Sequence, residues 1–468
     1  MKRLDLGSSH TWHNIFALAL PAMLAQLVSV LYSIVDRIYV SNIGGNEGAL
    51  SLIGVGVCAP ICSFITSFGF WVGLGGGPLL SISLGEKKEE NAKRILATAF
   101  WLCLILSLML MLFCYLFLKP MLLAFGASEA SYPYAYRYMK WYLMGTVLGV
   151  VSLGLNQFIT AMGHPVAAMI TISIGCLINV GLDPLFIYVF KLGVDGAAIA
   201  TVISELISLA FVIVFLLTKS KIRLAIRKPE MKIAWKIMTL GFSPWIILAT
   251  DSLVLIILNT VLQRYGGSDG DFYIEIATIV LAYESLFTGP LLGISSGTQP
   301  LLGYNYGAKN IDLIKKSEKE ITLFGFLFCC GAFGLSYLLA TPFATLFVGS
   351  FHSGSSDQSR LISEATKYIM VYMYGIIPLA FQYVFVDGLT GLGQAKYSIW
   401  LSLFRKVFLM IPFLFLLPFW TGTAESAFYA ELIADCGGGL VSTIVYLIIT
   451  PKIFRKRLAD TSKDILSA

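Results

Sequence analysis

The sequence predicts an all-α membrane protein of twelve transmembrane helices, in two six-helix lobes related by a pseudo-twofold axis along the membrane normal. The first observation is composition: 57% of the 468 residues are hydrophobic and 13% are charged, which is about half the charge of a soluble protein. The second is run length, because apolar stretches of about 20 to 35 residues recur and about 20 suffice to cross the hydrocarbon as a helix. The third is a repeat between the two halves of the chain.

Twelve apolar segments are predicted to span the membrane. They are 14–41, 50–84, 92–118, 132–161, 166–190, 195–218, 233–264, 271–306, 319–347, 361–391, 397–420 and 424–450. An even number of spans places both ends of the chain on one side. If that side is the cytoplasm, 23 of the 33 basic residues fall in cytoplasmic segments and seven in outer ones. Because basic residues concentrate on the cytoplasmic side, both termini are predicted to be cytoplasmic, and the positive charge anchors the inner leaflet rather than binding nucleic acid.

The repeat is a glycine-proline motif. Residues 75–87 and 297–309 both read Gly-x-x-Pro-Leu-Leu-x₄-Gly-x-Lys, near the cytoplasmic end of the second predicted span of each half. A shorter similarity relates residues 161–163 to 391–393, at the end of the fourth span of each half. Parallel six-span repeats are related by an axis along the membrane normal. We therefore predict an N-terminal lobe over 1–218, a basic cytoplasmic linker over 219–232 and a C-terminal lobe over 233–468.

Ionisable side chains inside membrane spans are costly, so they mark candidate functional sites. In the first half these are Asp36, Asp183 and Glu205. Asn179 precedes Asp183 by four residues, which places both on one helix face. Pro184 removes a helix hydrogen bond and predicts a bend beside the carboxylate. A carboxylate, an amide oxygen and a loosened backbone are suited to a proton or a hard cation.

Structural roles compete with this hypothesis. Asp36 could pair with Arg37 near the interface, and Asp183 could hold two helices together through hydrogen bonds. In the second half, Asp251, Glu284 and Asp387 are candidate functional acids for which a structural role stays open.

Two further acids of the second half favour a structural role. Glu431 and Asp435 share one helix face, which favours interhelical hydrogen bonding. Arg405 and Lys406 are expected to pair with one of these carboxylates or to extend toward the interface.

Two motifs of soluble enzymes are absent from the sequence. It contains no Gly-x₄-Gly-Lys-Ser/Thr or His-Glu-x-x-His, and its four scattered histidines do not predict a metal site. The glycine-rich run 73–77 lies within an apolar span, so it predicts close helix packing rather than a nucleotide loop. We predict a transporter without a cofactor. A membrane-embedded transferase would need His/Asp clusters at a membrane face, and a receptor would not need a two-half repeat.

Seven segments together resemble the multidrug and toxic compound extrusion (MATE) family over essentially the whole chain. They are LPAMLAQLVSVLYSIVDRIYVSNIG (20–44), GGGPLLSISLGEKK (75–88), NQFITAMGHP (156–165), INVGLDPLFIY (178–188), GVDGAAIATVISE (193–205), GTQPLLGYNYGAKN (297–310) and VDGLTGLGQAK (386–396). The Gly-x-Asn-Tyr-Gly-Ala run is similar to the branch that includes multidrug exporters of Gram-positive bacteria. In contrast, the turn Leu-Thr-Gly-Leu-Gly-Gln-Ala-Lys departs from the arginine-rich version of many relatives.

The resemblance implies a multidrug antiporter that exports organic, often cationic, compounds in exchange for protons or sodium. The implied coupling residues are Asp36, Asn179, Asp183 and Thr201, which would also form any sodium site. The implied substrate cavity includes Tyr32, Tyr138, Asn156 and Gln157. Other family members use acids that match Asp251 and Asp387, so the resemblance does not choose the lobe.

The expected mechanism is competition between cargo and coupling ion. Ionised Asp36 and Asp183 would attract a lipophilic cation with help from the Tyr32 ring, and a proton or sodium would displace it. The protein is expected to act as a monomer in a bacterial inner membrane. The alternatives within transport are a lipid-linked oligosaccharide flippase and a metabolite exporter of the same superfamily. A flippase usually has a cationic cavity, whereas the predicted one is acidic.

Overall fold

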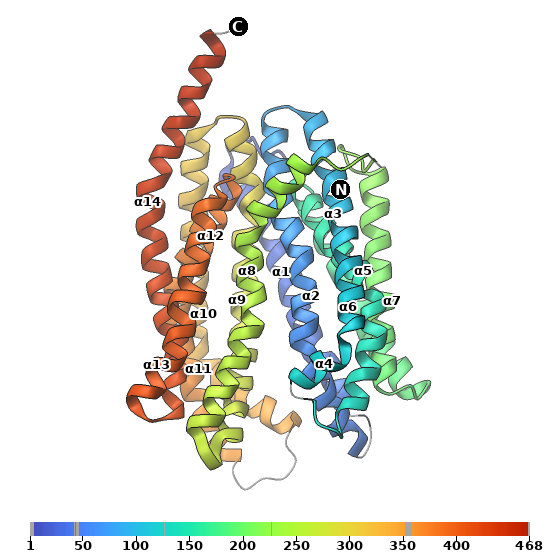
Figure 1. The fold of residues 1–468 in the computed structure, drawn as a ribbon. Helices are drawn as coiled ribbons and strands as arrows, with labels where there is room; N and C mark the ends of the chain where they lie inside the picture. The colour runs from blue at the N-terminus through green and yellow to red at the C-terminus, as the bar shows by residue number, and fades with distance from the viewer. Residues whose placement is uncertain are drawn as a thin grey trace. The chain divides into compact units, whose positions relative to one another are not determined.

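The computed structural model describes residues 4–466 except 42, 44, 45, 126, 226 and 352–357. The described residues form helices and loops (Figure 1). The α-helices are α1 (Thr11–Ser41), α2 (Asn46–Gly85), α3 (Glu89–Leu116), α4 (Leu118–Ala124), α5 (Tyr132–Ala161), α6 (Pro165–Pro184), α7 (Val194–Thr218), α8 (Met231–Gly266), α9 (Gly270–Gly307), α10 (Ile311–Phe351), α11 (Gln358–Gly391), α12 (Ala395–Leu403), α13 (Ile411–Thr421) and α14 (Tyr429–Leu466). Two π-helical segments, η1 (Leu185–Val189) and η3 (Phe404–Met410), and two 3₁₀ segments, η2 (Gly267–Asp269) and η4 (Ala424–Phe428), interrupt them.

The twelve predicted spans are confirmed. Within the described residues, twelve helical stretches are long and apolar enough to cross a membrane. The eleventh, Ala395–Thr421, is composite, because α12, η3 and α13 follow one another without a break. The third span ends earlier than expected, at Leu116, and the short helix α4 follows it. Lys2 and Arg3, part of the predicted charge asymmetry, lie outside the described residues.

Large apolar side chains cover the outer faces of the helices. On α3, Met109 is 64% exposed and Leu116 is 70% exposed, and Leu112 and Phe113 accompany them. In water such a continuous apolar surface would promote aggregation or partner binding. On a helix of 28 residues it is instead the surface expected to face lipid.

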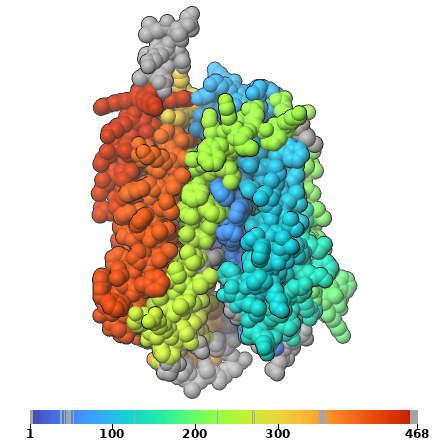
Figure 2. All heavy atoms as spheres, in the orientation of Figure 1, coloured from blue at the N-terminus to red at the C-terminus, as the bar shows by residue number. Residues whose placement is uncertain are grey.

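The chain forms two compact units that interleave along the sequence. The first unit contains Leu24–Leu80 and Glu89–Ser252, and the second contains Leu4–Met23, Ser81–Lys88 and Leu253–Ala468. In the first unit, α5, α6 and α7 pack against one another (Figure 1). In the space-filling view, side chains fill the space between α5 and α6 on the face shown (Figure 2). The lobe boundaries at 218 and 233 stay a prediction.

The backbone bears out the sequence repeat. Lys87 and Lys309 follow α2 and α9 and have φ angles of 60° and 61°, in the left-handed region that non-glycine residues rarely adopt. The next residues close equivalent turns, because Lys88 N donates to Ser83 O at 2.9 Å and Asn310 N donates to Asn305 O at 2.9 Å. Each half therefore ends its second span with the same strained turn.

The shorter repeat also shares a conformation. Gly163 and Gly393 have φ angles of 84° and 73°. Their amides donate to Thr160 O and Thr390 O, both at 2.9 Å. Both turns need a positive φ, which glycine adopts without steric cost.

The glycine-rich run of α2 allows close helix packing, as predicted. A Cβ atom added at Gly75 would lie 2.2 Å from the carbonyl oxygen of Ile237 and 2.7 Å from the amide nitrogen of Gly241, both on α8. A Cβ added at Gly77 would instead lie 3.7 Å from Ala161 Cβ, an ordinary van der Waals distance. Backbone atoms cannot move aside as a side chain can, so a substitution by alanine should be tolerated at Gly77 but not at Gly75.

The second unit contains a buried ion cluster in which the predicted pairing is confirmed. Arg405, within η3, pairs with Asp435 and lies 3.1 Å from Glu431, and Lys406 lies 3.9 Å from Glu431. All four side chains are nearly inaccessible. Removing one partner of such a cluster leaves an uncompensated charge, so it constrains how η3 packs on α14.

Glu86 forms a second ion cluster at the end of α2. It accepts from Arg457 Nη2 of α14 at 2.5 Å and lies 3.0 Å from Lys88 Nζ. Partial burial by itself would raise the pKa of Glu86, but the hydrogen bonds and charges of Arg457 and Lys88 hold that pKa below its usual value of 4.5.

We predict that Gly75→Ala lowers the thermal stability of the protein in detergent by an amount corresponding to about 1–3 kcal/mol, the usual cost of overpacking. Gly77→Ala is the matched control and is expected to unfold near the wild-type temperature. Unfolding monitored by tryptophan fluorescence measures both. Equal melting temperatures for the two variants would contradict this account of the α2–α8 contact.

We also predict that Glu86→Gln is less stable than wild type at pH 7, by about 1 kcal/mol. Because the folded-state pKa is the lower one, this stabilisation is present above the unfolded pKa and is lost as pH falls through the folded value. The difference in melting temperature should therefore shrink as pH falls below 4.5. A difference that stays constant between pH 7 and pH 3 would refute the assignment, and Glu129→Gln, at an exposed loop position, is the control.

Candidate functional site

Five of the predicted site residues meet inside the first unit. Tyr32 and Asp36 come from α1, Asn179 and Asp183 from α6, and Thr201 from α7. The Asp183 and Asp36 carboxyl groups lie within interaction range of each other, and the Tyr32 hydroxyl lies near Thr201. Three helices thus bring their polar groups to one place within an apolar bundle.

The amide of Asn179 connects the two ends of this network. Oriented so that donors face acceptors, its nitrogen donates to Asp183 Oδ2 at 2.8 Å and its oxygen lies 3.2 Å from Thr201 Oγ1. The Thr201 hydroxyl also donates to Ala197 O at 3.1 Å, which fixes its side chain on α7. The result is a continuous polar chain from Tyr32 to Asp36.

The two carboxyl groups at the centre are buried. Asp183 is 0% exposed and Asp36 is 8% exposed. Two buried carboxylates close to each other repel, so a proton on one of them is favoured. A hard cation could replace that proton, since carboxylate, amide and hydroxyl oxygens are its preferred ligands. The alternative pairing of Asp36 with Arg37 concerns a side chain outside those that the structure describes.

The backbone departs from α-helical geometry next to Asp183, where the bend was predicted. Pro184 ends α6, and the π-helical segment η1 begins at Leu185. A proline cannot donate an amide hydrogen bond, and π-helical turns commonly occur at functional sites. Tyr188 within η1 donates its hydroxyl hydrogen to Tyr39 O of α1 at 2.7 Å, which ties this segment to the helix that carries Asp36.

A cavity of about 170 Å³ adjoins the network within the first unit. Tyr32, Asn179 and Thr201 contribute to its wall, and so does Asn156 of α5. The other lining residues are Ser29, Thr66, Gly149, Ser152, Leu153, Thr171, Ile172, Gly175, Cys176, Ser204, Glu205 and Ser208. Hydroxyl and amide groups dominate, and Glu205 is the one acidic side chain among the described lining residues.

Glu205 is the acidic residue that lines this cavity. The sequence marked it as an acid within a span, but neither the predicted coupling residues nor the predicted cavity residues included it. It lies one helical turn after Thr201 on the same face of α7, and its Oε2 atom is buried without a hydrogen-bond partner. Two glycines of α5 make room for its carboxyl group: a Cβ added at Gly145 would lie 2.8 Å from Oε2, and one at Gly149 would also collide with it. The sequence showed an acid within a span, but not that α5 leaves space for it.

Two predicted cavity residues do not line this cavity. Gln157 packs against Gly73 of α2. Tyr138 is 6% exposed and stacks on Tyr142 with ring centroids 6.0 Å apart. Tyr138 nevertheless lies within electrostatic range of Asp36 and Tyr32, so it belongs to the surroundings of the acidic pair.

The acids of the second half occupy three different environments. Asp251 is exposed on α8 and belongs to the first unit. Asp387 of α11 is 7% exposed, near Ser295 and Gln299 of α9.

Glu284 of α9 interacts electrostatically with the cluster of Arg405, Lys406, Glu431 and Asp435. The structure thus brings Glu284 to a structural ion cluster. It does not gather Asp251, Glu284 and Asp387 into one site.

Comparison with known proteins gives one consistent result. The model of the MatE family matches residues 21–185 and 248–416. The chain is similar to the multidrug export protein MepA of Staphylococcus saprophyticus, at 24% identity over 98% of this chain and 97% of the relative. It is also similar to MepA of Staphylococcus aureus, at 25% identity over 96% and 95% of the two chains.

Solved structures share the fold. A structure described as MATE in complex with MaL6 superposes with a TM-score of 0.89, at 21% identity over 97% of this chain and 100% of the other. The structure of an outward-facing multidrug resistance MATE family transporter of the MOP superfamily superposes with a TM-score of 0.88, at 22% identity over 97% of this chain and 99% of the other.

A third solved structure is a MOP superfamily transporter from Pyrococcus furiosus, described as having a binding pocket of reverse polarity. It gives a TM-score of 0.88, at 21% identity over 97% of this chain and 99% of the other. The expected resemblance and the two-lobe, twelve-helix architecture are thereby confirmed, and the chain belongs to the MatE family of multi-pass membrane transporters.

Proposed function

We propose that this protein is a secondary active multidrug efflux antiporter that exports organic cations in exchange for protons or sodium. The observation that supports it is the buried pair Asp36–Asp183 next to a cavity whose one acidic residue, among the described lining residues, is Glu205. The names of the staphylococcal relatives point to the same activity. The proposal includes a bacterial inner membrane, cytoplasmic termini, a monomer, and no cofactor beyond the coupling ion.

The mechanism is competition between the organic cation and the coupling ion for the acidic residues of one lobe. With the cavity facing the cytoplasm, an organic cation is held by the Glu205 carboxylate and the ring of Tyr32. With the cavity facing outward, a proton or sodium at the pair of Asp36 and Asp183 shifts the network through Asn179 and Thr201. Because Tyr32, Asn179 and Thr201 belong to both the network and the cavity wall, the two occupancies are coupled.

The polarity of the cavity separates this proposal from its rivals. A flippase for lipid-linked oligosaccharides binds pyrophosphate and needs basic lining residues. The described lining of this cavity contains no lysine or arginine. A metabolite exporter that carries organic anions is disfavoured for the same reason.

The pair is predicted to be essential for coupling. Asp183→Asn and Asp36→Asn should each abolish ion-driven efflux of ethidium from proteoliposomes, at least about 100-fold, while the protein still inserts and folds. Loss of the exchangeable charge removes the competition. Glu129→Gln, an exposed acid far along the chain from the network, is the control. Wild-type efflux by both aspartate variants would refute the proposal.

Efflux from the same proteoliposomes under different ion gradients identifies the coupling ion. A pH gradient without sodium and a sodium gradient without a pH difference are imposed separately on wild-type protein. Proton coupling predicts efflux only in the first case and sodium coupling only in the second. Efflux that depends on neither gradient would contradict secondary active antiport.

Glu205 is predicted to bind the cargo rather than the coupling ion. Glu205→Gln should weaken the binding of a monovalent organic cation about tenfold, equivalent to about 1.4 kcal/mol, because it removes the charged lining residue while keeping its shape. Fluorescence polarisation of a cationic dye measures the change, with Glu129→Gln as control. Unchanged cation affinity, or an equal loss for a neutral dye, would show that Glu205 does not recognise charge.

A further inference from the structure

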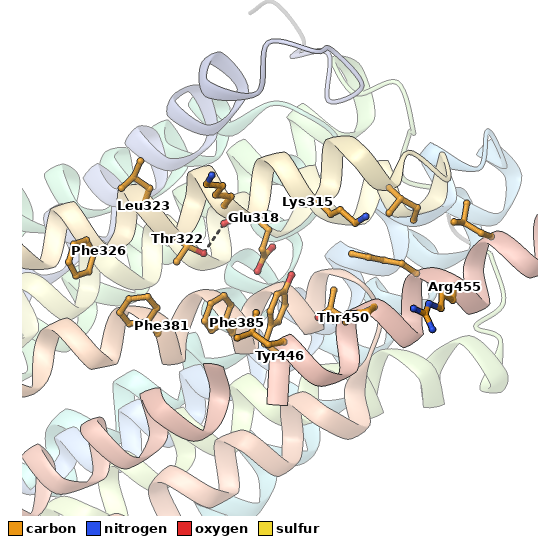
Figure 3. Close-up of a pocket in the computed structure, with 16 residues that line it drawn as sticks. Lys315, Glu318, Thr322, Leu323, Phe326, Phe381, Phe385, Tyr446, Thr450 and Arg455 are labelled. Carbon is orange, nitrogen blue, oxygen red and sulfur yellow. Dashed lines mark hydrogen bonds between the residues drawn. The ribbon is translucent and has the colours of Figure 1, made fainter. Parts of the chain in front are cut away.

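A second and larger hollow lies in the second unit, among α10, α11 and α14. Its volume is about 790 Å³ (Figure 3). It is lined by Ile311, Lys315, Glu318, Lys319, Thr322, Leu323, Phe326, Phe381, Phe385, Tyr446, Leu447, Thr450, Pro451, Phe454, Arg455 and Leu458. None of these residues takes part in the site described above, and we refer to this hollow as the C-terminal groove.

The groove is amphipathic along its length. Figure 3 shows Lys315 and Arg455 toward one end and Phe326 and Phe381 toward the other. Lys315 lies in the first turns of α10 and Arg455 in the last turns of α14. The topology predicted from basic residues places these helix ends at the cytoplasmic leaflet, so the aromatic end extends toward the hydrocarbon.

The basic end carries charge that the protein does not compensate. Neighbouring cations are paired, since Lys316 lies 4.0 Å from Glu320 and Arg457 bonds Glu86. Within the described residues, Lys315, Lys319 and Arg455 have no ion-pair partner, and all three are exposed. Three uncompensated cations beside an apolar channel attract an amphiphile with an anionic head.

Glu318 does not cancel these charges. Its side chain is 4% exposed and points toward Tyr446 in the middle of the groove (Figure 3). No ion pair joins it to the lysines or the arginine among the described residues. A Cβ added at Gly388 would lie 2.5 Å from Glu318 Oε1, so α11 leaves room for this carboxyl group at the floor of the groove.

We propose that the C-terminal groove binds an anionic phospholipid of the inner leaflet. The phosphate is held by Lys315, Lys319 and Arg455, and an acyl chain lies along Leu323, Phe326 and Phe381. Both halves of the ligand are required, because the basic end supplies charge recognition and the aromatic end supplies apolar contact. This site is independent of the proposed efflux activity.

The test is lipid binding by the purified full chain, measured by native mass spectrometry during titration in detergent. Phosphatidylglycerol is expected to bind at least about tenfold more tightly than phosphatidylcholine with the same acyl chains. The triple variant Lys315→Ala, Lys319→Ala, Arg455→Ala should lose that preference. The control triple Lys228→Ala, Lys232→Ala, Lys236→Ala removes equal charge from a cytoplasmic segment outside the groove and should keep it.

Further measurements distinguish a bound lipid from other ligands that could occupy the groove. Glycerol phosphate should not compete, because it lacks acyl chains, and Leu323→Glu should weaken phosphatidylglycerol binding as strongly as the basic triple. Folding of each variant is checked by gel filtration and by binding of a cationic dye. The proposal would be overturned if the two lipids bound equally or if the basic triple variant kept the preference for phosphatidylglycerol. It would also be overturned if glycerol phosphate or the dye displaced the lipid, or if dimers formed in place of bound lipid.

Discussion

The structure depends on how each charge within an apolar helix bundle is compensated. A carboxylate transferred into hydrocarbon without a partner would cost many kilocalories per mole, so each buried acid needs a proton, a cation or a hydrogen-bond donor. The chain solves this problem in three ways. Asp36 and Asp183 lie within interaction range of each other, Glu431 and Asp435 bind Arg405 and Lys406, and Glu205 keeps one oxygen without a partner beside a cavity. These solutions separate the acids of the ion cluster around Arg405 from the acids of the candidate site.

The ion cluster around Arg405 is a closed solution. Its two acids and two bases neutralise one another, and they fix the π-helical segment η3 against α14. Such a cluster is not expected to bind a further ion or ligand, because each of its charges already has a partner of opposite sign. The pair of Asp36 and Asp183 instead brings two acids from different helices together and shares Asn179 and Thr201 with the wall of a cavity, so we expect an exchangeable proton or cation there. That difference is the physical basis for placing transport in the first unit.

Local backbone geometry supports the same division. Both halves contain a π-helical segment in the fifth span, η1 after Pro184 and η3 before Ile411. In the second half this segment carries the cations of the closed cluster. In the first half it follows Asp183 of the candidate site and contacts α1 through Tyr188. The same backbone feature thus belongs to an ion cluster in one half and lies beside the candidate site in the other.

The sequence by itself determined the number of spans, the repeat and the identity of the acidic pair. Span length and hydropathy are set by bilayer thickness, and the spacing of Asn179 and Asp183 is set by the helical period, so both can be read without coordinates. The resemblance carried by the motifs added Tyr32 and Thr201, which come from other helices and which no local pattern connects to α6. The tertiary structure alone decided three further points.

The first of these is that Glu205 faces a cavity because Gly145 and Gly149 of a different helix leave space for it. The second is that Tyr138 and Gln157 lie outside that cavity, and the third is that Glu284 belongs to the ion cluster around Arg405. The reason is the same in each case. A sequence records how a side chain repeats along its own helix, whereas charge compensation and cavities arise between helices, from contacts whose partners are far apart in the chain.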